Sequence, residues 1–121
     1  MELEIRRFDR PDEARTFDHG SFEILHIGGM TIGRAVYGPG WRWSEHVAPT
    51  AGTPTCQVEH LSMVVSGQAA NGMDDGREVI VGPGDVFAVP PGHDSWVVGD
   101  EPYESLHFLG ADDYATAEQG P

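Results

Sequence analysis

The sequence contains no lysine, because all seven of its basic residues are arginines. This absence excludes mechanisms that form a Schiff base on a lysine side chain. The seven arginines stand against 20 acidic residues, which gives a formal net charge of −13. A chain with this charge repels the phosphates of nucleic acids and anionic membrane surfaces. We therefore expect no nucleic acid and no membrane among its partners.

Cysteine and long apolar runs are also scarce. The single cysteine, Cys56, cannot form a disulfide within the chain, and we expect it to be a buried, inert thiol. Residues 1–7 carry acidic side chains where a signal peptide carries basic ones, and they lack its apolar stretch. No apolar run approaches the roughly 18 residues that a membrane span requires. These absences predict a cytoplasmic protein.

Glycine and proline, in contrast, are plentiful and evenly spread. The 121 residues are enough for one domain, and 16 glycines and nine prolines separate short runs rich in valine, isoleucine and aromatic residues. This pattern is typical of an all-β domain built as a sandwich or a closed barrel. The predicted strands are residues 22–27, 31–37, 41–47, 56–66, 69–73, 77–81, 86–89, 95–98 and 103–109.

The strands define the expected domain organisation. Residues 1–20 are polar and irregular and are predicted to form an N-terminal arm or edge segment, residues 21–111 the β-barrel, and residues 112–121 a C-terminal tail. Within the barrel, Asp74, Asp75 and Gly76 predict a tight hairpin turn, because glycine readily adopts the positive φ that such a turn needs.

Six histidines are the feature that most needs an explanation. In a small barrel, alternate residues of each strand point inward, so histidines on different strands can converge. His46 ends one predicted strand, His60 lies in the next, and His93 precedes a third. If the first two strands pair in antiparallel fashion, His46 and His60 lie close together, and His93 needs only a neighbouring strand.

The spacing around these histidines resembles the first motif of the cupin family, in which Gly, five residues and His-x-His are followed by Glu, six residues and Gly. Gly40 precedes His46 by this spacing, and His60 precedes Gly67 by six intervening residues. The sequence departs from the motif at three points: Ala48 replaces the second histidine, the intervening loop is longer than usual, and His60 stands at the glutamate position.

The second cupin motif is matched more closely. It reads Gly, five residues, Pro-x-Gly, two residues and His, and Gly84, Pro90 and Gly92 fit it. The expected histidine position holds Ser95, while His93 lies two residues earlier. The resemblance, which covers roughly residues 30–109, implies a small single-domain cupin with a double-stranded β-helix, or jelly-roll, barrel.

The histidines predict a divalent metal bound by His46, His60 and His93. Three neutral imidazoles leave open coordination positions and suit Fe(II), Zn(II), Ni(II) or Mn(II) without selecting one. With iron, the site resembles that of thiol dioxygenases. With zinc, the bound water is acidified toward a pKa of ~7. The alternative is that these histidines are core or pocket residues without a metal.

Four further residues are candidates for contact with a substrate in the pocket: Arg42, Ser95, Trp96 and His107. Arg42 has the strand parity of His46 and could bind a substrate carboxylate, or it forms a surface salt bridge instead. Ser95 lies two positions after His93 and therefore points to the same face of a regular strand. Trp96 either walls an apolar substrate or packs in the core or a dimer interface. His107 lies in a predicted strand without matching a motif.

Two functions remain open. One is a metal-dependent enzyme, dioxygenase-like or isomerase-like, acting on a small organic molecule in the barrel. The other is a binding module that senses or sequesters a small molecule or metal without chemistry. We expect the protein to be a homodimer. The polar N-terminal arm is suited to crossing from one subunit to its partner.

Overall fold

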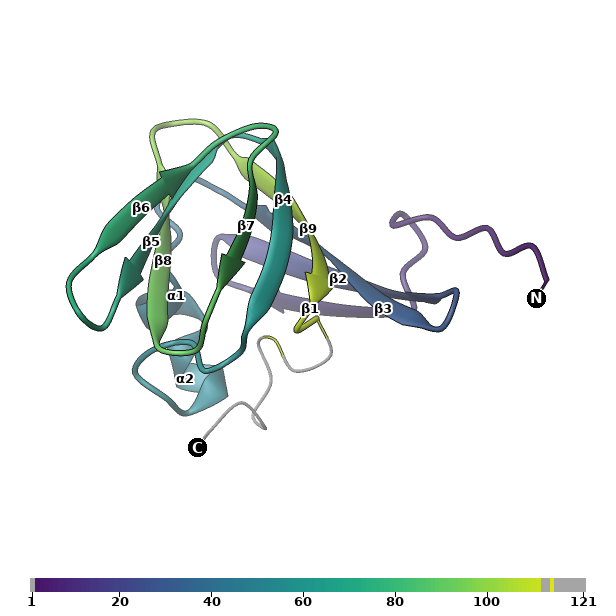
Figure 1. Cartoon of the computed structure of the whole chain (residues 1–121), viewed down its shortest axis with the longest axis horizontal. Helices are drawn as coiled ribbons and strands as arrows, with labels where there is room; N and C mark the ends of the chain where they lie inside the picture. Colours follow the sequence, from purple (N-terminus) through teal and green to yellow (C-terminus); the bar gives the residue numbers. More distant parts are fainter. Residues whose placement is uncertain (1, 112–113, 115–121) are drawn as a thin grey trace.

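The computed structural model describes residues 2–111 and Tyr114, and within them nine strands form two antiparallel sheets (Figure 1). The larger sheet has the strand order β1-β2-β3-β9-β4-β7, and the smaller one has the order β6-β5-β8. The strands of the larger sheet are β1 (Glu13–Phe17), β2 (Gly20–Ile27), β3 (Met30–Tyr37), β9 (Tyr103–Leu109), β4 (His60–Ser66) and β7 (Val86–Val89).

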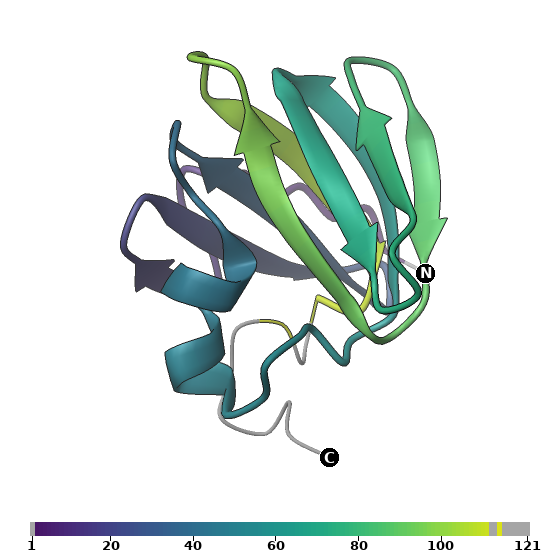
Figure 2. The ribbon, with the colours of Figure 1, turned by 90° about the vertical axis from the view of Figure 1, so that its left-hand side faces the viewer.

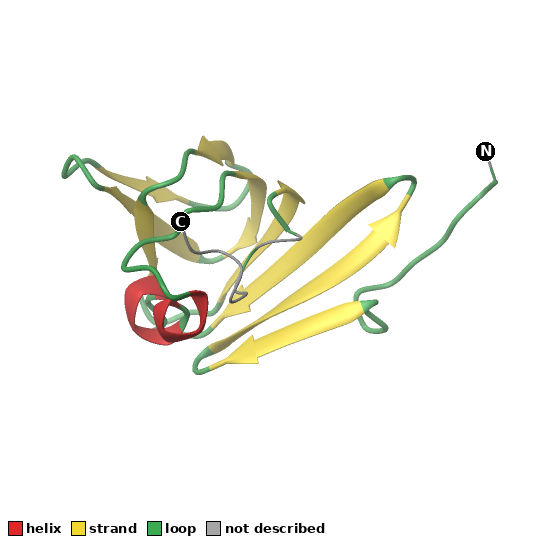
Figure 3. Cartoon of the chain, turned by 90° about the horizontal axis from the view of Figure 1, so that it is seen from below, coloured by secondary structure: helices red, strands yellow, loops and turns green. Residues whose placement is uncertain are grey.

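The smaller sheet consists of β6 (Glu78–Val81), β5 (Gln68–Met73) and β8 (His93–Val98). Two short helices, α1 (Trp43–His46) and α2 (Ala48–Ala51), lie at one end of the strands (Figure 2). Seen from below, the first residues extend away from the strands (Figure 3). Neither described helix has the length and apolar character needed to cross a membrane.

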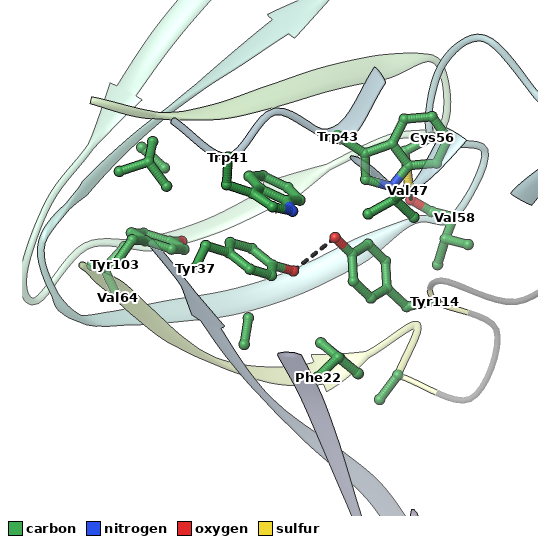
Figure 4. Close-up of a cluster of buried hydrophobic side chains, with 14 of the residues drawn as sticks. Phe22, Tyr37, Trp41, Trp43, Val47, Cys56, Val58, Val64, Tyr103 and Tyr114 are labelled. Carbon is green, nitrogen blue, oxygen red and sulfur yellow. Dashed lines mark hydrogen bonds between the residues drawn. The ribbon is translucent and has the colours of Figure 1, made fainter. Parts of the chain in front are cut away.

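The core lies between the two sheets because the strands alternate buried and more exposed residues. In β9, for example, Tyr103, Ser105 and His107 are buried, whereas the residues between them are only half-buried. Aromatic side chains fill much of this space (Figure 4). The rings of Tyr37 and Trp41 are stacked with centroids 3.8 Å apart and planes 6° apart. The all-β architecture expected from the sequence, with its core between two sheets, is therefore present.

The predicted strand at residues 41–47 is wrong. Only Arg42 forms a β-bridge, with Trp96, and the chain then turns into α1. Trp43 and Val47 are both fully buried, and their spacing of four residues is that of one helix face rather than of a strand. The parity argument that placed Arg42 and His46 on one face of a strand therefore does not apply.

Two other boundaries differ from the prediction. The irregular N-terminal segment ends at residue 12, because residues 13–17 form β1 along the edge of the larger sheet, in agreement with the edge-segment alternative for this region. The predicted strand 56–66 begins only at His60, and Cys56 makes a single bridge to His93. The tail, residues 112–121, lies outside the described residues apart from Tyr114.

The predicted hairpin turn is confirmed. Gly76 has a φ of +92°, and its backbone N–H donates to the carbonyl of Met73 at 2.9 Å, between β5 and β6. The predicted strands at 86–89 and 103–109 coincide with β7 and β9. Both boundaries agree with the observed strands to within two residues for five other predictions: 22–27, 31–37, 69–73, 77–81 and 95–98. Local alternation and turn chemistry thus locate most of the sheet.

Candidate metal centre

Three buried side chains meet where β4 and β8 begin. The ligand atoms of Cys56, His60 and His93 all lie within 4.8 Å of one another. His60 is the first residue of β4 and His93 the first residue of β8. Cys56 is tied to β8 by its backbone, since its N–H donates to the His93 carbonyl at 2.7 Å and its carbonyl accepts from the Gly92 N–H at 2.8 Å.

The segment between Cys56 and His60 is held in place by the end of β9. Gly110 has a φ of +89°, and a Cβ added there would overlap the Glu59 carbonyl and the Val58 side chain. Only glycine fits this close approach without displacement of the neighbouring backbone. Cys56 itself packs beside Trp43 and Val58 (Figure 4). The position of the thiol is therefore fixed from two sides.

His60 faces the thiol with one ring nitrogen. Its Nε2 lies 3.4 Å from the Cys56 sulfur, while its buried Nδ1 has no hydrogen-bond partner among the described residues. Burial lowers the pKa of His60 well below its usual value, and the neighbouring His107 and His93 lower it further. The imidazole is consequently neutral at pH 7, which is the form that binds metals.

His93 is oriented by a backbone carbonyl. Its Nδ1 lies 2.8 Å from the Pro90 oxygen. Because a carbonyl can only accept, Nδ1 carries the proton and the Nε2 lone pair is left for another partner. Burial lowers the pKa of His93, although the bond to Pro90 acts in the opposite direction. This is the arrangement in which proteins commonly hold a metal-ligating histidine.

The donor set suits a soft or borderline divalent ion. In a tetrahedral zinc site with one sulfur and one nitrogen ligand, these two atoms lie about 3.5 Å apart. The distance of 3.4 Å between Cys56 and His60 agrees with this value. Thiolate and imidazole favour zinc over Mn(II), which prefers oxygen ligands. Three protein ligands leave a fourth position for an exogenous group.

His46 lies outside this group. Its Nδ1 accepts the backbone N–H of Arg42 at 2.9 Å, and its ring packs against His19 with centroids 4.7 Å apart. The lone pair of Nδ1 is therefore engaged by the backbone and is not free for a metal. Of the three predicted histidines, the structure brings together His60 and His93, and it places Cys56 beside them.

His107 reaches the same region but is fully hydrogen-bonded. Its Nδ1 lies 2.9 Å from the Ser62 hydroxyl and its Nε2 lies 2.9 Å from the Ser105 hydroxyl. Burial lowers the pKa of His107 to about 3, so it is neutral at pH 7. Its ring lies edge-on to that of His60, with centroids 5.3 Å apart. These contacts make it a support for the His60 ring.

The other predicted pocket residues have different surroundings. Ser95 lines the barrel cavity. Arg42 pairs with Asp94 at 3.0 Å, and its guanidinium lies 4.3 Å from the ring centre of Trp96. The Arg42 side chain is 41% exposed. Arg42 thus binds an acid of the chain itself, as in the surface alternative, and neither it nor Trp96 lines the cavity.

The cavity beside the cluster is small. Its volume is about 30 Å³, and His60, His93, His107 and Trp41 are among its lining residues. A water molecule needs roughly 10–15 Å³ by this measure, so there is room for about two. Among the described lining residues none is acidic and none is an arginine. Tyr114, which lies edge-on to His60 at 5.2 Å, helps to close the cavity.

Cys56 and Tyr114 were not among the predicted site residues. A signal for Cys56 was present, because it is four residues from His60 and shares its parity. Its role depends on the bridge to His93, which joins residues far apart in the sequence. Tyr114 falls in the predicted tail, and no local pattern indicates that it enters the barrel.

Comparisons with known proteins identify the fold. No protein-family model matches the chain, and no curated protein matches its sequence. A protein of unknown function from Rhizobium leguminosarum aligns with a TM-score of 0.58 and 19% identity, covering 88% of this chain and 95% of that protein.

Two solved structures of named function also match. A cupin-superfamily sugar phosphate isomerase from Silicibacter pomeroyi aligns with a TM-score of 0.56 and 21% identity, covering 78% of this chain and 68% of its own. A polyketide cyclase from Streptomyces resistomycificus aligns with a TM-score of 0.59 and 20% identity, covering 88% and 78%. At these identities the likeness establishes the fold alone, and the chain has a cupin-like β fold.

Proposed function

We propose that this protein is a metal-binding barrel that holds one Zn(II) ion through Cys56, His60 and His93. The observation that carries the proposal is the convergence of these three buried ligand atoms within 4.8 Å. Two features support it: the Pro90 carbonyl leaves the His93 Nε2 lone pair available, and both imidazoles are neutral at pH 7. Bound zinc would act as a Lewis acid that lowers the pKa of a coordinated water.

Neighbouring residues of the chain orient the two histidine ligands without a bound metal. Pro90 sets the tautomer of His93, and the ring of His107, anchored by two serines, supports one face of His60. The Cys56 thiol must lose its proton to bind, because the thiolate is the ligand. Metal binding therefore releases a proton and strengthens as the pH rises.

The size of the cavity favours a metal site over an enzyme for large organic substrates. A sugar phosphate or a polyketide, the compounds named for two structural neighbours, has many more atoms than the two water molecules for which the cavity has room. The ring of Tyr114, 5.2 Å from that of His60, occupies part of the space that a substrate of that size would need. We therefore favour metal binding with a very small exogenous ligand.

Metal analysis of purified protein tests this proposal. We expect one zinc per chain after loading and dialysis, and less than one tenth of this in His60→Ala. His46→Ala is the matched control, since it also removes a histidine but leaves the three ligands intact, and it should retain the metal. Thermal melting of each variant shows whether it is folded.

A second measurement avoids dependence on the stability of His60→Ala. Cobalt(II) bound to a thiolate absorbs in the near ultraviolet by sulfur-to-metal charge transfer, and this band should be present in the wild type and absent in Cys56→Ser. Wild-type protein without stoichiometric metal, or with cobalt but without the thiolate band, contradicts the proposed ligand set.

A further inference from the structure

The charges around the proposed metal site do not balance. A divalent ion bound by one thiolate and two neutral imidazoles keeps one uncompensated positive charge. Among the described residues, no acidic side chain lines the adjacent cavity. A buried charge is costly unless it is paired. The described acids whose charges act on His93, Asp94 and Asp74, do not line this cavity. An anion bound in the cavity would supply the missing negative charge.

His60 and His93 both line the cavity, so an ion held by them would be accessible from this space. The space, about 30 Å³, suits a ligand of two or three heavy atoms. It does not suit a bulky aromatic acid. Size and charge together point to a small monovalent anion.

A hydrogen-bond donor for such an anion is already present. Trp41 is 1% exposed and lines the cavity, and its indole Nε1 has no partner among the described residues. Its ring is held by stacking on Tyr37 at 3.8 Å. Figure 4 shows the indole nitrogen on the side where the hydroxyls of Tyr37 and Tyr114 meet. An indole N–H can only donate, so its natural partner is an acceptor.

The tyrosine pair offers a second donor. The Tyr37 hydroxyl donates to the Tyr114 oxygen at 2.7 Å, which leaves the Tyr114 proton for another acceptor. Burial raises the pKa of both phenols well above the usual value, so both keep their protons at pH 7. Among the described residues, the lining of the cavity thus presents neutral donors and no acidic side chain, which is what a small anion requires.

We propose that the fourth position of the metal site takes a small monovalent anion that accepts a hydrogen bond from the indole N–H of Trp41. This inference rests on the proposed metal function and names the ligand class of that site. Trp41 is then a ligand-contacting residue that selects for size and charge.

Titration of the zinc-loaded protein with sodium formate tests the inference. The indole N–H resonance of Trp41, identified by its loss in Trp41→Phe, should shift saturably with formate. Benzoate, which carries the same charge but exceeds the cavity, should leave it unmoved. Trp41→Phe keeps an aromatic ring against Tyr37 and should bind zinc normally but formate about tenfold or more weakly, because it lacks one bond to a charged acceptor.

Trp96→Phe provides the matched control. Trp96 also carries an indole, but it packs against the guanidinium of Arg42 and does not line the cavity. Its substitution should leave formate affinity unchanged.

The outcomes separate the two proposals. Protein that binds one zinc per chain, but whose Trp41 resonance is unmoved by formate, overturns the anion site alone. Equal formate affinity in wild type and Trp41→Phe does the same. A chain that binds no zinc overturns both the metal site and the anion site.

Discussion

The Nε2 atom of His60 lies 3.4 Å from the sulfur of Cys56, inside a region that no charged side chain of the described residues lines. The pair joins a loop residue to the first residue of β4. A thiol and a neutral imidazole at this distance can share a proton or a metal ion. Four predictions follow from this site and from the packing that surrounds it.

Replacement of Cys56 by serine should reduce zinc affinity by about 100-fold or more. A serine hydroxyl keeps its proton at neutral pH and is a poor ligand, and even loss of outer hydrogen-bond partners typically reduces metal affinity 10- to 100-fold. Competition with a chromophoric chelator measures the change. An unchanged dissociation constant in a folded variant would show that sulfur does not bind the metal.

Acidification should destabilise the metal-free protein through His107. Its pKa is about 3 in the folded chain, against ~6.5 in the unfolded chain, so the unfolded state takes up a proton that the folded state cannot. This contribution is fully present above pH ~6.5 and is lost as the pH falls from there toward 3, at about 1.4 kcal/mol per pH unit.

Urea denaturation between pH 7 and pH 4 measures this slope. His107→Gln removes the titrating ring but keeps a polar side chain between Ser62 and Ser105. Its unfolding free energy should depend less steeply on pH than that of the wild type. Identical slopes in the two proteins would assign the acid sensitivity to other groups.

Gly110→Ala should destabilise the chain more than Gly84→Ala. Both glycines have a positive φ, +89° and +88°, so both substitutions strain the backbone. Only at Gly110 would the new Cβ meet another segment, the Glu59 carbonyl and the side chain of Val58, whereas nothing lies near Gly84. We expect a difference of roughly 1–3 kcal/mol in urea denaturation, in the range of other local backbone strain.

Gly110→Ala should also weaken metal binding, because the displaced segment connects Cys56 to His60. Gly84→Ala should bind zinc like the wild type. Equal stability and equal zinc affinity of the two variants would show that the close approach at Gly110 does not hold the thiol in place.

The hydroxyls of Tyr37 and Tyr114 should contribute to the free energy of unfolding as a pair rather than independently. Each is buried, and they bond at 2.7 Å, so Tyr37→Phe or Tyr114→Phe alone strands one polar group at a cost of about 1–3 kcal/mol. The double variant leaves neither hydroxyl behind, so its free energy of unfolding should fall by less than the sum of the losses in the two single variants. A double-mutant cycle by urea denaturation measures the coupling, and strict additivity would argue against the bond.

Much of the sheet could be predicted because its signals are local. Alternation and turn glycines sit within a few residues of the strands that they define, as at the Gly76 hairpin. The wrong strand prediction at residues 41–47 also comes from reliance on local signals. Trp41, Trp43 and Val47 are residue types common in strands, and the helical spacing of Trp43 and Val47 spans only one turn.

The site could be predicted only in part, because local motif spacing marks some of its residues and long-range contacts place the others. The motif spacing marks His60 and His93, which the structure brings together. The same spacing marks His46, but the helix α1 turns it toward His19 and its backbone bond occupies the nitrogen that a metal would need. The place of Cys56 depends on a backbone bridge to His93, which spans 37 positions of the chain and leaves no local pattern.

Arg15 links the edge of the larger sheet to the closure of the cavity. It lies in β1, whose described strand partner is β2, and its Nη1 donates to the carbonyls of Ala111 at 3.1 Å and Tyr114 at 2.6 Å. Edge strands fray more readily than central ones. Thermal fraying of β1 would therefore loosen the anchor of Tyr114, so the access of water and ions to the cavity beside His60 depends on an edge strand of the larger sheet.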